Sequence, residues 1–231
     1  MDQNRTLGES VKQSIIGTVR GTGEIVNAVT DTVAGTLTGA LRGVGNVGQA
    51  LTGAVSDVAR GVIHGTREVG GDLAGAAKGA VIGTLRGAKE IGGEAIDTVG
   101  STVENLISAT AEVGGDLGGA TKQAVEGALQ GAKSIGLNAF DAAGAAAGGA
   151  VRATAQAGGD VAQTAKNAIE GAIVGAKSIG VDAAQAASAA ATGALKAAGD
   201  IGAEALEQVR RAATGTIAGV KVVVKEPFRK E

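Results

Sequence analysis

The chain is built almost entirely from a 22-residue repeat, and a fixed period of this length constrains the fold more than any local motif does. Reading from Gly17 in steps of 22 residues gives ten copies in phase, the last of which begins at Gly215. The third position of the repeat is a branched aliphatic residue in every copy, and the ninth position is one in every copy except Ala157. The first position is Gly in every copy except Asn105. The period therefore determines where small and aliphatic residues lie.

Each repeat divides into two 11-residue units with the same polar and apolar pattern, such as the unit DLAGAAKGAVI from Asp72. Eleven residues in three helical turns is about 3.67 residues per turn, close to the relaxed α-helix, so one face stays aligned over a great length. The pattern predicts an all-α chain that forms a single very long amphipathic helix, nearly straight or with a right-handed supercoil, and assembles with other copies. Helical hairpins are the alternative, with bends at the Gly pairs 70–71, 92–93, 114–115 and 158–159.

On a continuous helix, positions 2, 3, 5, 6, 9 and 10 of each 11-residue unit fall on one apolar arc. We expect this face to make contact through Val19, Ile25, Leu41, Val47, Ile63, Val69, Leu85, Ile91, Ile107, Val113, Leu129, Ile135, Val151, Ile173, Ile179, Leu195, Ile201 and Ile217. Charges flank the face on both borders, with Lys89, Lys133 and Lys177 on one and Asp72, Glu94, Asp116, Asp160, Asp182 and Glu204 on the other. Parallel neighbouring helices could pair these opposite borders.

Composition argues against an enzyme and against the usual ligand sites. The chain has no Cys and one His, so no metal site of the usual kinds is expected, and no catalytic or cofactor-binding residue can be assigned. That residue, His64, takes a position that is Arg42 and Arg86 in other copies, so we interpret it as a solvated polar residue. The net charge is −2, which predicts no nucleic-acid partner. No small-molecule substrate is expected either.

The chain divides into a polar N-terminal segment (1–9), the repeat array (10–219) and a basic tail (220–231). Val, Leu and Thr dominate before Ala139 and Ala dominates after it, which we interpret as a gradient within one array. No segment has the features of a signal peptide or a membrane-spanning helix. We therefore expect a cytoplasmic protein that is peripheral to a membrane or lipid surface.

The glycine content makes a lone helix unstable. Each Gly costs about 1 kcal/mol against Ala in a helix, so the 41 Gly residues oppose one long helix by tens of kcal/mol in total. We therefore expect the apolar face to be covered by lipid or by other copies of the chain.

Several segments resemble known families of 11-residue-repeat proteins. RGAKEIGGE at 86–94 and HGTREVGGD at 64–72 resemble the repeats of synucleins, and AGTLTGALRG at 34–43 resembles those of perilipins. The pattern is also similar to that of late embryogenesis abundant proteins with 11-residue repeats. The first resemblance implies a helix that coats membranes or lipid droplets and folds on contact with them, and the second implies a protein that is disordered when wet and helical when dried.

Three functions remain open from the sequence. The first is a lipid-surface coat or scaffold that folds on contact and self-associates through its Gly- and Ala-rich face. The second is a self-assembling right-handed coiled-coil rod, filament or tube without lipid, and the third is a protectant against desiccation or stress. The expected partners are a lipid surface and further copies of the chain.

Overall fold

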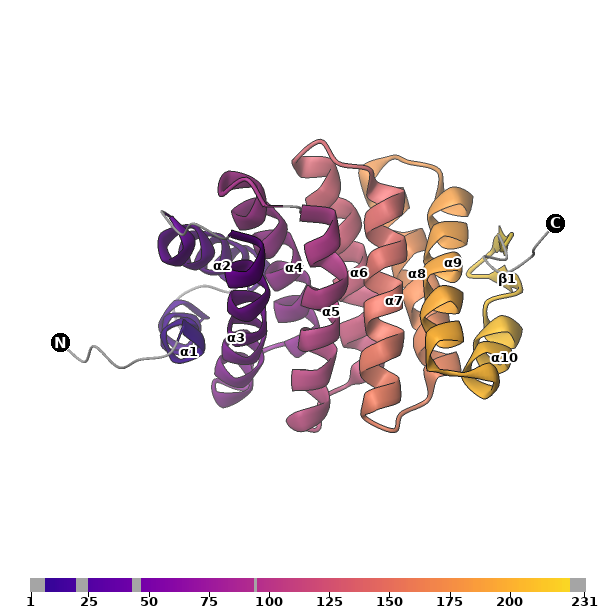
Figure 1. The fold of residues 1–231 in the computed structure, drawn as a ribbon, viewed down its shortest axis with the longest axis horizontal. Helices are drawn as coiled ribbons and strands as arrows, with labels where there is room; N and C mark the ends of the chain where they lie inside the picture. The colour runs from indigo at the N-terminus through magenta and orange to yellow at the C-terminus, as the bar shows by residue number, and fades with distance from the viewer. Residues whose placement is uncertain (1–6, 20–24, 43–46, 94, 225–231) are drawn as a thin grey trace.

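The protein is a row of short helices, each of which corresponds to about one 22-residue repeat (Figure 1). The computed structural model describes residues 7–19, 25–42, 47–93 and 95–224. Within these residues the helices are α1 (Leu7–Val19), α2 (Ile25–Leu41), α3 (Val47–Glu68), α4 (Leu73–Glu90), α5 (Ala95–Glu112), α6 (Leu117–Ser134), α7 (Ala139–Gln156), α8 (Val161–Ile179), α9 (Ala183–Ile201) and α10 (Ala203–Ala212). A repeat is thus a helix of about 18 residues followed by a tight turn.

The turns are encoded by a Gly followed two residues later by an N-capping side chain. Gly70, Gly92, Gly114, Gly136, Gly158 and Gly180 end their helices in the left-handed conformation, with φ between 66° and 76°. The next residue bonds back into the helix it leaves, as when Gly115 N donates to Thr110 O at 2.9 Å. Asp116 then caps α6, because its Oδ1 accepts a hydrogen bond from Gly118 N at 2.9 Å. The chain therefore reverses direction within about four residues.

The helices form two layers, and each helix from α1 to α9 packs most closely on a helix two places away along the chain. We call α1, α3, α5, α7 and α9 the odd layer, and α2, α4, α6, α8 and α10 the even layer. Consecutive helices pack against each other across the two layers. Such stacking of helix pairs is the arrangement of an α-solenoid.

Glycines let helices of one layer approach closely. A Cβ atom at Gly149 of α7 would lie under 3.0 Å from the carbonyl oxygen of Gly100 in α5, a separation that real Cβ atoms do not show. A Cβ atom at Gly171 of α8 would likewise lie under 3.0 Å from the carbonyl oxygen of Lys122 in α6. Glycine is therefore needed at these positions because the neighbouring backbone fills the place of a side chain.

One continuous apolar cluster runs through the described part of the molecule and holds the helices together. The third-position residues of the repeat are in it and are buried, from Leu41 in α2 to Leu195 in α9. Many of the other members are Ala, which fits the short distance between helices. The aliphatic residues are thus covered by the chain itself.

The prediction of one very long helix is wrong, and so are the coiled coil and the filament that it implied. The described residues instead form ten packed helices. The physical reason is that the 22-residue period combines an 18-residue helix with a reversal. The chain reverses at the four Gly pairs considered for hairpins and also at Gly136 and Gly180.

The two ends of the array depart from the repeat. Helix α1 already begins at Leu7, inside the segment 1–9. After α10, the strands β1 (Gly215–Ile217) and β2 (Val220–Val222) form an antiparallel hairpin in which Thr216 pairs with Lys221. The hairpin therefore extends into the segment 220–231, and β2 contacts α9. None of the described helices has the length and apolar character needed to cross a membrane.

Candidate binding groove

The residues expected to form one apolar face lie in two different environments. The third-position members are core residues, namely Leu41, Ile63, Leu85, Ile107, Leu129, Val151, Ile173, Leu195 and Ile217. The ninth-position members lie at or beside helix ends, and of these Ile25, Val69, Ile91, Val113, Ile135 and Ile179 are partly buried while Ile201 is 43% exposed. The side chains of Val19 and Val47 lie outside the described residues. No single continuous face joins the two sets.

The flanking charges serve the turns of the same chain. Asp72, Asp116, Asp160 and Asp182 are the N-caps of α4, α6, α8 and α9, and Glu204 lies in the first turn of α10. Glu94 lies outside the described residues. The Lys89 Nζ donates a hydrogen bond to the carbonyl oxygen of Ile135, and the Lys133 Nζ does the same to Ile179. Lys177 occupies the equivalent last turn of α8. These lysines thus sit at the negative ends of helix dipoles.

Ion pairs between neighbouring helices repeat along each layer. In the even layer the Lys78 Nζ lies 2.8 Å from Glu126 Oε1, joining α4 to α6, and Lys122 pairs with Glu170 at 3.5 Å, joining α6 to α8. In the odd layer Lys12 pairs with Glu68 at 2.9 Å, joining α1 to α3, and Arg152 pairs with Glu104 at 2.8 Å, joining α5 to α7. At the N-terminal end, the hydrogen bond and charge of Glu68 raise the pKa of Lys12. Much of the charge of the chain is therefore used between its own helices.

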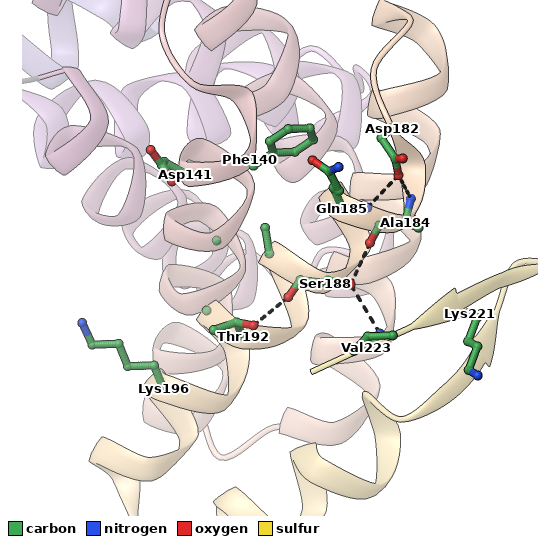
Figure 2. Close-up of a pocket in the computed structure, with 13 residues that line it drawn as sticks. Phe140, Asp141, Asp182, Ala184, Gln185, Ser188, Thr192, Lys196, Lys221 and Val223 are labelled. Carbon is green, nitrogen blue, oxygen red and sulfur yellow. Dashed lines mark hydrogen bonds between the residues drawn. The ribbon is translucent and has the colours of Figure 1, made fainter. Parts of the chain in front are cut away.

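The described residues offer no constellation for a metal ion, since no group of three or more His, Asp or Glu side chains converges within them. Two neighbouring cavities lie instead on the outer side of the odd layer. The larger of these two has a volume of about 850 Å³ and lies between α7, α9 and the β-hairpin (Figure 2). Phe140 and Asp182 lie at one end of it and Lys196 at the other, with Val223 at the side of the hairpin.

A second cavity of about 330 Å³ continues from the first across α5, α7 and α9. The two share Gly144, Gly193 and Lys196, so they form a single depression. We call it the α7–α9 groove. It extends from Phe140 at the start of α7 to Arg152 and Asp200 near the ends of α7 and α9. The groove is open because glycine and alanine occupy floor positions that larger side chains would fill.

Ser188, Thr192 and Asp182, which line the larger cavity, already have hydrogen-bond partners within the chain. Ser188 Oγ donates to Ala184 O at 2.7 Å and accepts a hydrogen bond from Val223 N at 3.3 Å. Thr192 Oγ1 donates to Ser188 O at 2.8 Å, and Asp182 caps α9 (Figure 2). The lining of the larger cavity is mainly apolar, whereas the second cavity has polar and apolar lining in similar measure.

The groove is not among the sites that the sequence predicts. The signal that could have found it is the change to Ala near residue 139, which we interpreted only as a gradient. In a two-layer array this change removes bulk from the outer surfaces of α7 and α9 while leaving their cores filled. The functional candidates that were missed are Phe140, Gly144, Arg152, Gly193 and Lys196.

Comparisons with known proteins give a fold neighbour only. No protein-family model matches the chain, and no curated protein is similar to it. Among solved structures, the crystal structure of the de novo designed helical repeat protein DHR7 aligns with 71% of this chain and 91% of that chain, at 24% identity and a TM-score of 0.46. This similarity carries no information on function.

Proposed function

We propose that the protein is a non-enzymatic helical-repeat scaffold that binds an amphipathic helix of a partner protein in the α7–α9 groove. The observation that carries this proposal is the groove itself, a depression shared by two cavities of about 850 and 330 Å³ on the outer side of the odd layer. Concave, mainly apolar sites with a few polar groups at the edge are the usual form of a binding site.

The chemistry of the groove favours a helix over an extended peptide. An extended peptide brings unpaired backbone N–H and C=O groups that need partners when they are buried. The groove offers few, because Ser188, Thr192 and Asp182 are already bonded within the chain. A helix satisfies its own backbone and presents only side chains, as in other helix-in-groove complexes.

The dimensions of the groove also fit a helix. The groove follows α7, which has 18 residues, so its length is about 27 Å at 1.5 Å per residue. Glycines on the floor let a bound helix approach closely, as small residues do between packed helices. Phe140 at one end supplies a large apolar contact for an aliphatic anchor on the partner.

The reason for expecting a lipid partner no longer holds. The lipid-coat hypothesis required aliphatic residues that only an external surface could cover. Ile63, Leu129 and Val151 are instead fully buried among helices of the same chain. The same burial removes the argument that further copies of the chain must cover this face.

The proposal is tested by selecting peptides from a phage-displayed library of 18-residue helical sequences on the full chain. We expect enriched helical peptides whose binding is lost in Ala189→Trp, because Ala189 lines the groove and an indole would fill it. Ala184→Trp is a second variant, since Ala184 is exposed and its substitution leaves the core intact. Ala40→Trp, on the exposed side of α2, is the matched control and should bind normally.

Two results would overturn the proposal. One is a selection that enriches no helical peptide. The other is a set of peptides that bind Ala189→Trp and Ala184→Trp as well as they bind the unmodified protein. Circular dichroism and the melting temperature of each variant establish that it is folded.

A further inference from the structure

We propose that Arg152, together with Lys196, binds the carboxylate of an Asp or Glu side chain on the helix that occupies the α7–α9 groove. This inference rests on the proposed function and names the chemistry of the partner. It places an acidic residue of the partner at the end of the groove where α5, α7 and α9 meet.

Arg152 is held in place from one side. Its Nε donates a hydrogen bond to Glu104 Oε2 at 2.8 Å, which links α7 to α5. The other oxygen of Glu104 accepts a hydrogen bond from Gln156 Nε2 at 3.1 Å. The guanidinium group is thus positioned before any partner arrives, which reduces the entropy lost on binding.

Two glycines make room for this position. A Cβ at Gly100 would lie 3.4 Å from Arg152 Nη2, and a Cβ at Gly148 would lie 3.5 Å from Nη1. The end of the guanidinium group therefore lies beside the backbones of α5 and α7, on the groove floor. A larger side chain at either position would compete with Arg152 for the same space.

The end of Arg152 is available for a ligand. Within the described residues, Arg152 forms a hydrogen bond through Nε, whereas Nη1 and Nη2 have no hydrogen-bond partner. Lys196 lines the same cavity and likewise has no ion-pair partner in the described part of the chain. Two parallel N–H donors of an arginine match the two oxygens of a carboxylate, and a nearby ammonium group adds to the attraction.

The surrounding charges favour a single negative charge on the ligand. Glu104 pairs with Arg152, and Asp200 lies on the rim beside Lys196. These carboxylates offset part of the positive charge, so a carboxylate suits the site better than a doubly charged phosphate. The residues that correspond to Arg152 two and four repeats earlier are Ser108 and His64, which lack the two parallel N–H donors of an arginine. The site is therefore specific to the C-terminal half of the array.

The test uses the helical peptides selected for the groove and measures their affinity by fluorescence polarisation. We expect them to share an Asp or Glu, and we expect its replacement by Asn or Gln to weaken binding to the unmodified protein about tenfold. The same replacement should have little effect on the affinity of the peptides for the Arg152→Gln variant. Arg152→Lys should behave like Arg152→Gln, because an ammonium group cannot form the paired contact.

Two further variants separate binding from folding. Lys196→Gln removes an exposed side chain that has no ion-pair partner among the described residues, and it should weaken the binding of acidic peptides only. Lys166→Gln, on the exposed side of α8 in the even layer, is the matched control and should bind all peptides normally.

Failure of this inference is distinguishable from failure of the proposed function. If Ala189→Trp abolishes peptide binding but replacing the acidic residue of the peptides does not change their affinity, the carboxylate site is wrong and the groove is still the binding site. The carboxylate site is also wrong if replacing the acidic residue of the peptide weakens binding equally to the unmodified protein, Arg152→Gln and Lys196→Gln. If no peptide binds in the groove, both proposals are wrong.

Discussion

Gly193 of α9 lies so close to Gly144 of α7 that a Cβ atom at position 193 would be under 3.0 Å from the Gly144 carbonyl oxygen, carbonyl carbon and Cα. The obstacle is backbone, which cannot move aside as a flexible side chain can. This contact sets the spacing of the two helices that form the groove. The same approach to a neighbouring carbonyl oxygen, under 3.0 Å from an added Cβ, recurs at the first-position residues Gly61, Gly83, Gly127, Gly149 and Gly171.

Gly193→Ala should therefore destabilise the protein although alanine is the better helix former. We expect a loss of about 1–3 kcal/mol, typical of adding bulk to a packed interior. The matched control is Gly53→Ala on α3, where a Cβ would meet nothing within 4 Å. That variant should gain about 0.5–1 kcal/mol from helix propensity. Urea denaturation measures both, and a neutral Gly193→Ala would contradict the close approach.

The left-handed turn at Gly136 supplies a second prediction. Its φ is 76°, and a Cβ there would meet nothing within 4 Å, so the cost of substitution is conformational alone. Gly136→Ala should lose about 1–2 kcal/mol. Gly136→Asn should lose less, because asparagine tolerates this conformation. Equal melting temperatures for the two variants would show that the turn does not hold this geometry.

The cap at Asp116 is a hydrogen-bonding site. Asn138 caps α7 in the same way, with its side chain accepting from Phe140 N at 2.9 Å. Asp116→Ala should therefore cost about 0.5–2 kcal/mol, while Asp116→Asn should cost little. If Asp116 instead paired with a basic border on another copy, Asp116→Asn would be as harmful as Asp116→Ala. Melting temperatures at low and high salt decide between the two.

The pair Lys78–Glu126 should contribute more to stability than Lys122–Glu170. The side chains of the first pair are 16% and 9% exposed, whereas those of the second are 40% and 29% exposed. Glu126→Ala leaves a largely buried ammonium group without its partner and should cost about 1–3 kcal/mol. Glu170→Ala should cost under about 1 kcal/mol, as exposed pairs do. Similar losses in urea denaturation would contradict the difference in burial.

The 22-residue period and the helical content could be predicted from the sequence, but the path of the chain could not. Ile91 and Leu85 share one apolar face only if the helix continues through Gly92. In the structure Ile91 is the C-cap of α4, and Gly92 has a φ of 75°. The motif of Gly, one further residue and Asp, as at Gly70 and Asp72, marks a helix end and a helix start. An 11-residue period accounts equally well for the recurrence of this Asp, which is why the pattern alone predicts a charged border.

The groove could not be predicted for a different reason. Phe140, Arg152 and Lys196 come from two helices, and they meet because α7 and α9 lie side by side in one layer. A wheel drawn for one helix contains no information on which repeats become neighbours. The position of the Arg152 guanidinium group likewise depends on Glu104 of α5, at a separation of 48 residues.

Small-angle X-ray scattering of the full chain in buffer without lipid tests the central claim most directly, that the chain covers its own apolar residues. A two-layer array of this length predicts a radius of gyration of about 20 Å, close to that of a folded domain. A single helix of about 200 residues would give a rod about 300 Å long with a radius of gyration of about 90 Å, and an unfolded chain would give about 50 Å. A value near 20 Å, with a strongly helical circular dichroism spectrum from the same sample, is the result that the structure predicts. Either of the larger values would contradict it.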